Sequence, residues 1–212
     1  MIPYGSDFAL SDNLLNRFEV EAFRKEHQLE TYFVITYVGA HGVANHLDQV
    51  LDAAEVLVDT NVLFLLIGQG MEKVRLINGA KRRGLNNVRF LDSVPKHEVF
   101  KYILASDMGA SILKRVDTFK TVYSNKTFDY FSCKKPVLMA IDGVSRQLVE
   151  DAKAGSYVEP ENTSAYNTVI SAYLDNPQRL LQEGENGYQF AKMNFDRQVL
   201  ANRYICELIK AI

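Results

Sequence analysis

Two short glycine loops carry the residue types that bind phosphate. Residues 39–42 (Gly-Ala-His-Gly) and 68–70 (Gly-Gln-Gly) each follow an apolar run and precede a segment with helical spacing. Glycines let the backbone approach a diphosphate closely, and the following helix offers its N-terminal amides to negative charge. We therefore predict a phosphate site at these loops. A tight turn between a strand and a helix explains each loop equally well on its own.

A third segment adds a cation and a carboxylate. Ser124 or Asn125 can cap a helix, and Lys126 then falls in its first turn. A lysine at that end opposes the helix dipole, so a nearby anion would rationalise it. Asp129, three residues on, shares the helix face and can accept hydrogen bonds from the vicinal hydroxyls of a ribose. A solvated lysine and a surface aspartate are the alternatives.

The sequence lacks the residue patterns of nicotinamide-cofactor sites and of metal sites. The glycine loops lack the third glycine that is typical of nicotinamide-cofactor sites. No Asp-x-Asp pair and no His, Cys and carboxylate cluster has the spacing of metal ligands, so we expect neither a metal nor a cofactor. The thiol of Cys133 is expected to serve packing.

The pattern of apolar residues predicts the elements that position these loops. Short apolar runs predict strands at 33–38, 62–67, 88–91, 108–113, 136–140 and 155–158, and helices are predicted at 47–57, 74–84, 96–104, 125–132 and 145–153. From Ser164 onward the chain is predicted to be helical, with a break at residues 175–177. Strands that alternate with helices predict an α/β fold, a doubly wound, mostly parallel Rossmann-like sheet of about six strands with C-terminal helices. Ligands bind such sheets at the carboxyl ends of the strands, where the strand order reverses.

The composition of the chain limits the kinds of binding partner and the location that we expect. The 212 residues include 24 basic and 26 acidic side chains, a formal net charge of −2, which does not favour nucleic acid as a partner. The longest apolar run has six residues, far from the roughly 20 that span a bilayer. The chain opens without a signal-peptide pattern and has only two cysteines, which favours a cytoplasmic location.

The order of these segments resembles family 4 (group 1) retaining glycosyltransferases of the GT-B fold. The segments that carry the resemblance are 39–42, 65–70, 87–95, 105–107, 124–130 and 135–137. Within that family the chain is most similar to bacterial polysaccharide and O-antigen transferases, which carry a Ser-Lys-x-x-Glu-Tyr-like segment. The resemblance covers about residues 32–195.

The resemblance implies a division of the chain. Residues 32–195 correspond to the C-terminal, nucleotide-sugar donor-binding domain, and residues 1–31 to an interdomain hinge and a lead-in. The N-terminal acceptor domain is then missing, and the helix within 196–212 would cross to it. We accordingly expect the apolar residues of that helix to be partly uncovered: Leu200, Tyr204, Leu208 and Ile209.

The resemblance also implies roles for single residues. Gly39, His41 and Gly42 would lie at the donor diphosphate, with His41 exposed to it, and Gly68 and Gly70 would line the cleft beside them. Val94 matches the position that holds the base through backbone contacts.

Further roles follow for the third segment, which contributes Ser124 and Asn125 to the expected site. Lys126 would lie near phosphate or sugar. Asp129 matches the second glutamate of the family's Glu-x7-Glu motif, which binds ribose hydroxyls. The first glutamate is replaced by Thr121, a departure that bears on catalysis.

These roles imply a transferase that moves a sugar, from a UDP-linked donor as we expect, to a polysaccharide or lipid-linked acceptor with retention. This chain alone is expected to be inactive, and the full-length enzyme to work in the cytoplasm, at the inner face of the membrane. A sugar-nucleotide epimerase of GT-B fold and a catalytically silent nucleotide-binding domain are the alternatives. Catalytic residues stay unassigned.

Overall fold

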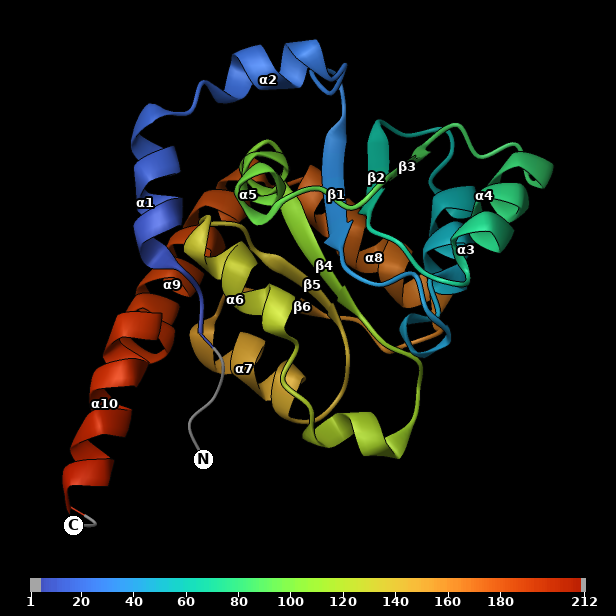
Figure 1. Cartoon of the computed structure of the whole chain (residues 1–212). Helices are drawn as coiled ribbons and strands as arrows, with labels where there is room; N and C mark the ends of the chain where they lie inside the picture. The colour runs from blue at the N-terminus through green and yellow to red at the C-terminus, as the bar shows by residue number, and fades with distance from the viewer. Residues whose placement is uncertain (1–4, 211–212) are drawn as a thin grey trace.

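A single sheet of six parallel strands forms the centre of the molecule (Figure 1). The computed structural model describes residues 5–210, save the side chains of Arg203 and Glu207. The strand order is β3-β2-β1-β4-β5-β6. The strands are β1 (Phe33–Val38), β2 (Val62–Ile67), β3 (Val88–Leu91), β4 (Met108–Ile112), β5 (Val137–Ala140) and β6 (Gly155–Tyr157). The predicted doubly wound α/β fold is confirmed, with the last three strands one residue shorter than expected.

Helices cover both faces of this sheet. They are α1 (Phe8–Arg17), α2 (Val20–Glu26), α3 (Asp48–Val56), α4 (Lys73–Arg82), α5 (Lys96–Leu104), α6 (Asn125–Ser132), α7 (Val144–Ala152), α8 (Thr163–Leu174), α9 (Pro177–Phe195) and α10 (Arg197–Lys210), with short 3-10 helices η1 (Val43–Asn45) and η2 (Asp117–Thr121). Side chains of α3, α4 and α8 pack on one face, and those of α5, α6, α7 and α9 on the other. Within β1, Ile35 packs on the first face and Val34 on the second, which explains the apolar runs without alternation.

The order of the strands reverses between β1 and β4. Tyr130 of α6 joins these two strands, because its hydroxyl donates to the Ala110 carbonyl at 3.1 Å and accepts from the Val38 amide at 3.1 Å. A Cβ atom on Gly109 of β4 would lie 2.2 Å from the Tyr130 ring, so only glycine lets the ring pack there. This contact seats α6 at the point where a doubly wound sheet forms its crevice.

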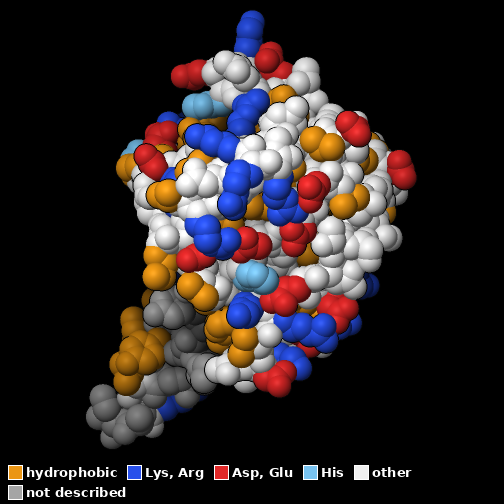
Figure 2. All heavy atoms as spheres, turned by 90° about the vertical axis from the view of Figure 1, so that its right-hand side faces the viewer, with side chains coloured by type: hydrophobic (Ala, Val, Ile, Leu, Met, Phe, Trp, Pro, Cys, Tyr) orange, Lys and Arg blue, Asp and Glu red, His pale blue; other side chains and the backbone are white. Residues whose placement is uncertain are grey.

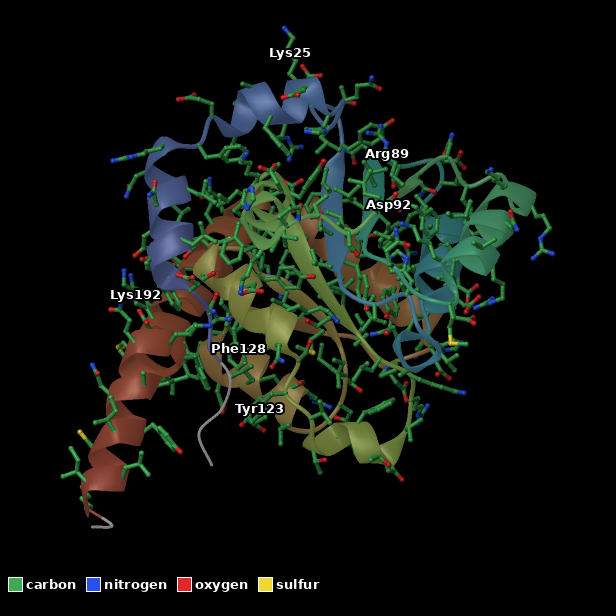
Figure 3. The ribbon with its side chains drawn as sticks, viewed as in Figure 1. Lys25, Arg89, Asp92, Tyr123, Phe128 and Lys192 are labelled. Atoms are coloured by element: carbon green, nitrogen blue, oxygen red, sulfur yellow. The ribbon has the colours of Figure 1, made fainter. Side chains whose placement is uncertain are left out.

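The segment predicted as a lead-in packs against the domain. The side chain of Phe8 is 2% exposed in a cluster with side chains of α5 and α6, and Phe23 of α2 packs edge-on against Tyr102. Asp12 of α1 accepts hydrogen bonds from Lys192 and Tyr188 of α9, at 2.8 and 2.7 Å (Figure 3). Residues 1–4, part of the expected hinge, lie outside the described residues.

Helix α10 extends away from the sheet (Figures 1 and 2). The prediction of uncovered apolar residues is confirmed for Tyr204, Leu208 and Ile209, which are 54%, 48% and 67% exposed. It is wrong for Leu200, which is 7% exposed because its side chain packs beside Gly5. Between residues 5 and 210 the structure contains no helix that combines the length and apolar character needed to cross a membrane.

Candidate functional site

A pocket of about 320 Å³ lies at the carboxyl ends of β1, β2 and β3. Its wall is formed by the loops that follow these strands and by the start of α5. Three residues that the sequence predicts for the site, Gly39, Gly68 and Val94, line it together. The further lining residues are Val38, Ala40, Ile67, Gln69, Ser93 and Val99. The pocket therefore combines loop backbone with the apolar side chains of Val38, Ile67 and Val99.

The two glycine loops cross at close range. Gly39 and Gly68 have φ angles of +148° and +153°, which residues other than glycine rarely adopt. A Cβ atom on Gly68 would lie 1.9 Å from the Gly39 carbonyl oxygen, and one on Gly39 would lie 3.1 Å from Cε of Lys126. The glycines thus let backbone pack on backbone and bring the first loop against α6.

Lys126 places an ammonium group beside this crossing. Its Nζ lies 4.5 Å from the centre of the Tyr37 ring, and Tyr37 is itself held by a 2.9 Å hydrogen bond from its hydroxyl to the Ala40 carbonyl. No carboxylate pairs with this amine among residues 5–210, and burial lowers the pKa of Lys126 to about 8. A half-buried cation without a counterion is expected to attract an anion.

Asp129 lies on the next turn of α6, and its side chain is 24% exposed. The Oδ1 atom accepts a hydrogen bond from Ser6 Oγ at 2.9 Å and lies 3.3 Å from Lys96 Nζ. Within the described part of the chain, no hydrogen bond reaches Oδ2. One oxygen is therefore anchored while the other can accept a hydrogen bond from a ligand.

Lys73 and Lys96 are site residues that the sequence analysis missed. The buried ammonium of Lys73 donates to the Gly68 carbonyl at 2.8 Å, the Leu91 carbonyl at 2.7 Å and Asp92 Oδ1 at 2.7 Å. Asp92 lies just past β3 (Figure 3), so Lys73 ties the ends of β2 and β3 together under the pocket. Lys73 lies in the first turn of α4, so the same reasoning that identified Lys126 could have identified it.

The expectation that His41 is exposed to a bound phosphate is wrong. The residue is 0% exposed, with its ring 6.1 Å from the ring centres of both Tyr37 and Phe90, so it does not face a bound phosphate. Neither ring nitrogen has a hydrogen-bond partner, and burial together with the charge of Lys73 lowers the pKa of His41 to about 4. His41 is consequently neutral and lies behind the loop.

Gly70 and Gly42 lie outside the pocket. A Cβ atom on Gly70 would lie 2.3 Å from the His41 carbonyl oxygen, so Gly70 supports the first loop from behind. Gly42 has an ordinary φ of −110° and lines a smaller pocket of about 60 Å³ that also contains His46 and Lys114. Their roles in binding stay predictions.

The start of α6 differs from the expected cap. Ser124 occupies the N-cap position, yet neither its hydroxyl nor the side chain of Asn125 caps the helix. The buried Ser124 hydroxyl donates to Ser111 Oγ at 3.2 Å, and Asn125 is exposed. Thr121, at the position of the family's first glutamate, is exposed and donates to the Thr118 carbonyl at 3.1 Å.

Other groups in the described residues offer no competing centre. The thiol of Cys133 is fully buried, and burial raises its pKa, so it is not a nucleophile. No group of three or more His, Cys, Asp and Glu side chains in residues 5–210 is arranged to hold a metal. A second pocket of about 150 Å³ lies between η2 and the ends of β5 and β6, with Phe119 and Tyr157 in its wall.

A family model described as glycosyl transferases group 1 matches residues 19–190. This range begins earlier than the boundary at residue 32 that the sequence motifs indicate, and it includes all of α2.

Two relatives of known name share part of the sequence. WcaI of Escherichia coli is 37% identical over 73 residues, which are 34% of this chain and 18% of that protein. Its name refers to a glycosyl transferase of colanic acid biosynthesis. D-inositol 3-phosphate glycosyltransferase 2 of Catenulispora acidiphila is 27% identical over 126 residues, which are 58% of this chain and 28% of that protein.

Solved structures share the fold. The Anabaena protein HepE, in complex with UDP and glucose, has a TM-score of 0.81 at 20% identity, and the match covers 98% of this chain and 56% of HepE. The C-terminal domain of the group 1 protein LpcC from Francisella tularensis has a TM-score of 0.74 at 15% identity, with 91% of this chain and 100% of that domain covered. This chain thus spans about half of HepE and the whole of a domain solved separately.

Proposed function

Because this chain belongs to the group 1 glycosyl transferase family, we propose that it binds the nucleotide-sugar donor of such an enzyme. The observation that carries the proposal is the unpaired ammonium of Lys126, which lies beside Gly39, one of the residues that line the pocket. That the HepE structure contains UDP and glucose supports a UDP-linked donor, since the two chains share the fold.

The proposed pose follows from the chemistry of each part. The diphosphate lies between the loop backbone and Lys126, where the positive charge stabilises it without a metal. The amides of Gly39, His41 and Gly68 already donate to backbone carbonyls, so the remaining loop amides face the phosphates. The ribose hydroxyls donate to Oδ2 of Asp129, and the backbone near Val94 contacts the base. The carboxylate and the ammonium come from successive turns of α6, so one rigid element spaces the two contacts.

The proposed reaction is transfer of the donor sugar with retention. As the bond from the anomeric carbon to the diphosphate oxygen breaks, negative charge grows on the leaving nucleoside diphosphate, and Lys126 with the loop amides stabilises it. The transferred sugar is a hexose or an N-acetylhexosamine. Because Thr121 replaces the family's first glutamate, the contact usually made there to the sugar must come from another group.

The proposed acceptor is a polysaccharide or a lipid-linked sugar, in line with the colanic acid context in the name of WcaI. An additional acceptor domain is needed for transfer, and the exposed apolar face of α10 is proposed to contact it. The complete enzyme would work in the cytoplasm, peripherally at the inner face of the membrane. The Thr121 replacement also favours a second candidate, a nucleotide-binding domain without catalysis.

Titration calorimetry with UDP and UMP tests the proposal. We expect the chain to bind UDP more tightly than UMP, because only UDP offers two phosphates to the loops and Lys126. Addition of a metal chelator should leave the affinity unchanged. Equal affinities for UDP and UMP would refute the diphosphate role of this site.

A further inference from the structure

The beginning and the end of the described chain meet beside Asp129. Residues 5–6 and 195–197 form what we call the terminal clamp. The Ser6 amide donates to the Phe195 carbonyl at 3.0 Å, and the Arg197 amide donates to the Ser6 carbonyl at 3.3 Å. Arg197 Nε donates to the Gly5 carbonyl at 3.1 Å. A Cβ atom on Gly5 would lie 2.1 Å from the Phe195 carbonyl oxygen, so the two segments are in close contact.

The side chain of Ser6 leads from this clamp to the donor site. It is fully buried, and its hydroxyl donates to Asp129 Oδ1 at 2.9 Å with Ser132 Oγ at 3.0 Å as a second neighbour. A carboxylate is the stronger acceptor of the two, because hydrogen bonds to charged groups are roughly twice as strong as neutral ones. Ser6 therefore holds the carboxylate rather than filling space alone.

Lys96 approaches the same carboxylate oxygen, at 3.3 Å. An exposed aspartate would rotate freely and would lose that freedom on binding a ligand. Here Oδ1 is held from two sides, and Oδ2 has no hydrogen bond within residues 5–210. The open oxygen is thus oriented before a ligand arrives, which reduces the entropy lost on binding.

We propose that Ser6 is a positioning residue that orients Asp129 for the ribose and couples the nucleotide site to the terminal clamp. This inference rests on the proposed function, because it requires Asp129 to contact the donor. Any displacement of residues 195–197 shifts the Ser6 backbone through its two hydrogen bonds, and the hydroxyl that holds Asp129 moves with it. Conversely, a nucleotide on Asp129 stabilises the clamped arrangement, since coupling between sites is reciprocal.

A double-mutant cycle with UDP as the ligand tests this inference. Ser6→Ala, Asp129→Asn and the double variant are compared by titration calorimetry, with Ser11→Ala as the matched control. Ser11 is also fully buried, but its hydroxyl donates within α1, to the Phe8 carbonyl at 3.2 Å. Melting temperatures confirm that each variant is folded.

We expect Asp129→Asn to weaken UDP binding about tenfold or more, since a hydrogen bond between a ligand and a charged group contributes more than a factor of ten. Ser6→Ala should weaken it about three- to tenfold, because it removes only the orientation of that carboxylate. Ser11→Ala should stay within about twofold. The double variant should bind no more weakly than Asp129→Asn alone, because Ser6 acts only through that carboxylate.

The outcomes separate the two proposals. If the unmodified chain does not bind UDP, the proposed function fails and this inference fails with it. If Asp129→Asn weakens binding while Ser6→Ala matches Ser11→Ala, or if the two effects add in the double variant, the positioning role alone is refuted. Should Ser6→Ala not fold, Ser6→Thr and Ser6→Val replace it. These have similar shapes, and only threonine keeps the hydroxyl, so equal UDP affinities would overturn the inference.

Discussion

At the scale of single residues, two basic side chains near the site lack hydrogen-bond or ion-pair partners among the described residues, but they differ in how accessible they are. Lys126 has a half-buried ammonium with only an aromatic ring beside it, whereas His41 is wholly enclosed and has no hydrogen bond to either nitrogen. The lysine is partly exposed and lies beside Gly39 of the pocket wall, so an anion can reach it. The histidine lies behind the loop, so its environment affects stability and not ligand attraction.

Lys126 predicts a pH dependence of UDP binding. With a pKa of about 8 in the free protein, the amine loses its proton as the pH rises through that value, and the positive charge that attracts the diphosphate disappears. UDP affinity should fall by about tenfold between roughly pH 7 and pH 9, a range above the last ionisation of a phosphate near pH 6. Calorimetry across this range measures the fall.

Two variants identify the group responsible. Lys126→Arg keeps its charge throughout this range and should bind UDP with nearly constant affinity, because the guanidinium does not deprotonate. Lys126→Met should bind weakly at every pH. A fall of the same size in Lys126→Met would show that another group causes the pH dependence.

Because of His41, we expect the ligand-free chain to become less stable as the pH is lowered from 7 to 5. Burial lowers its pKa from 6.5 to about 4, so between these values the unfolded state binds more protons than the folded state. The free energy of unfolding should therefore drop by about 1 to 2 kcal/mol from pH 7 to pH 5 through this residue. His41→Leu should flatten that drop. It should be close to neutral at pH 7, because the histidine nitrogens have no hydrogen bonds to lose. Urea unfolding at both pH values checks this, and an unchanged drop in His41→Leu would contradict it.

At the scale of elements, the site depends on how loops and α6 cross at the reversal of strand order. Tyr130 joins β1 to β4 and seats α6, while the loops after β1 and β2 pack backbone against backbone at Gly39 and Gly68. Lys73 holds the ends of β2 and β3 from below. These contacts give the pocket rigid walls, which a site for a polar ligand requires.

From the contact between the two loops, we expect alanine substitutions at Gly68 and Gly42 to differ strongly in their effect on stability. Gly68→Ala should destabilise the fold by about 2 to 4 kcal/mol, because a methyl group would lie 1.9 Å from a backbone oxygen and φ is positive. Gly42→Ala should change stability by less than about 1 kcal/mol, since its φ is ordinary and its nearest neighbour is Asn45 Oδ1 at 3.6 Å. Thermal or urea unfolding of both variants measures the difference. Equal stabilities would show that the crossing does not constrain the loops.

At the scale of the whole molecule, the proposed donor-binding unit has an exposed apolar surface on α10. The terminal clamp brings residues 5–6 and 195–197 together beside the nucleotide site. Beyond the clamp, α10 carries exposed Tyr204, Ile205, Leu208 and Ile209 away from the sheet (Figure 2). The chain spans 56% of HepE. A separate acceptor domain resting on α10 accords with all three observations.

This arrangement predicts binding without turnover. The 212-residue chain should bind UDP but should release none from a UDP-sugar in an acceptor-dependent manner, because the acceptor must be held opposite the donor. A coupled assay for released UDP, with and without a candidate polysaccharide acceptor, measures this. Acceptor-dependent release by the chain alone would contradict the need for a second domain.

Local patterns in the sequence determine the elements and the general position of the site. Strands buried on both faces read as uninterrupted apolar runs, so the runs at 33–38 and 62–67 identify β1 and β2 without any tertiary information. Parallel order then requires the loops after the strands to meet at one edge, which brings Gly39, Gly68 and Val94 into one pocket. The helix of Lys126 and Asp129 follows from the same periodicity.

Tertiary structure alone decided which polar groups are available. Local sequence suggests both His41 and Lys126 as phosphate contacts, yet packing against Tyr37 and Phe90 encloses His41, whereas Lys126 stays partly exposed beside Gly39. Ser6 is 123 residues from Asp129 in the chain, so no local pattern indicates their hydrogen bond. Burial and long-range contacts depend on the whole folded chain, whereas backbone periodicity depends on neighbours, and this difference separates what the sequence reveals from what the fold decides.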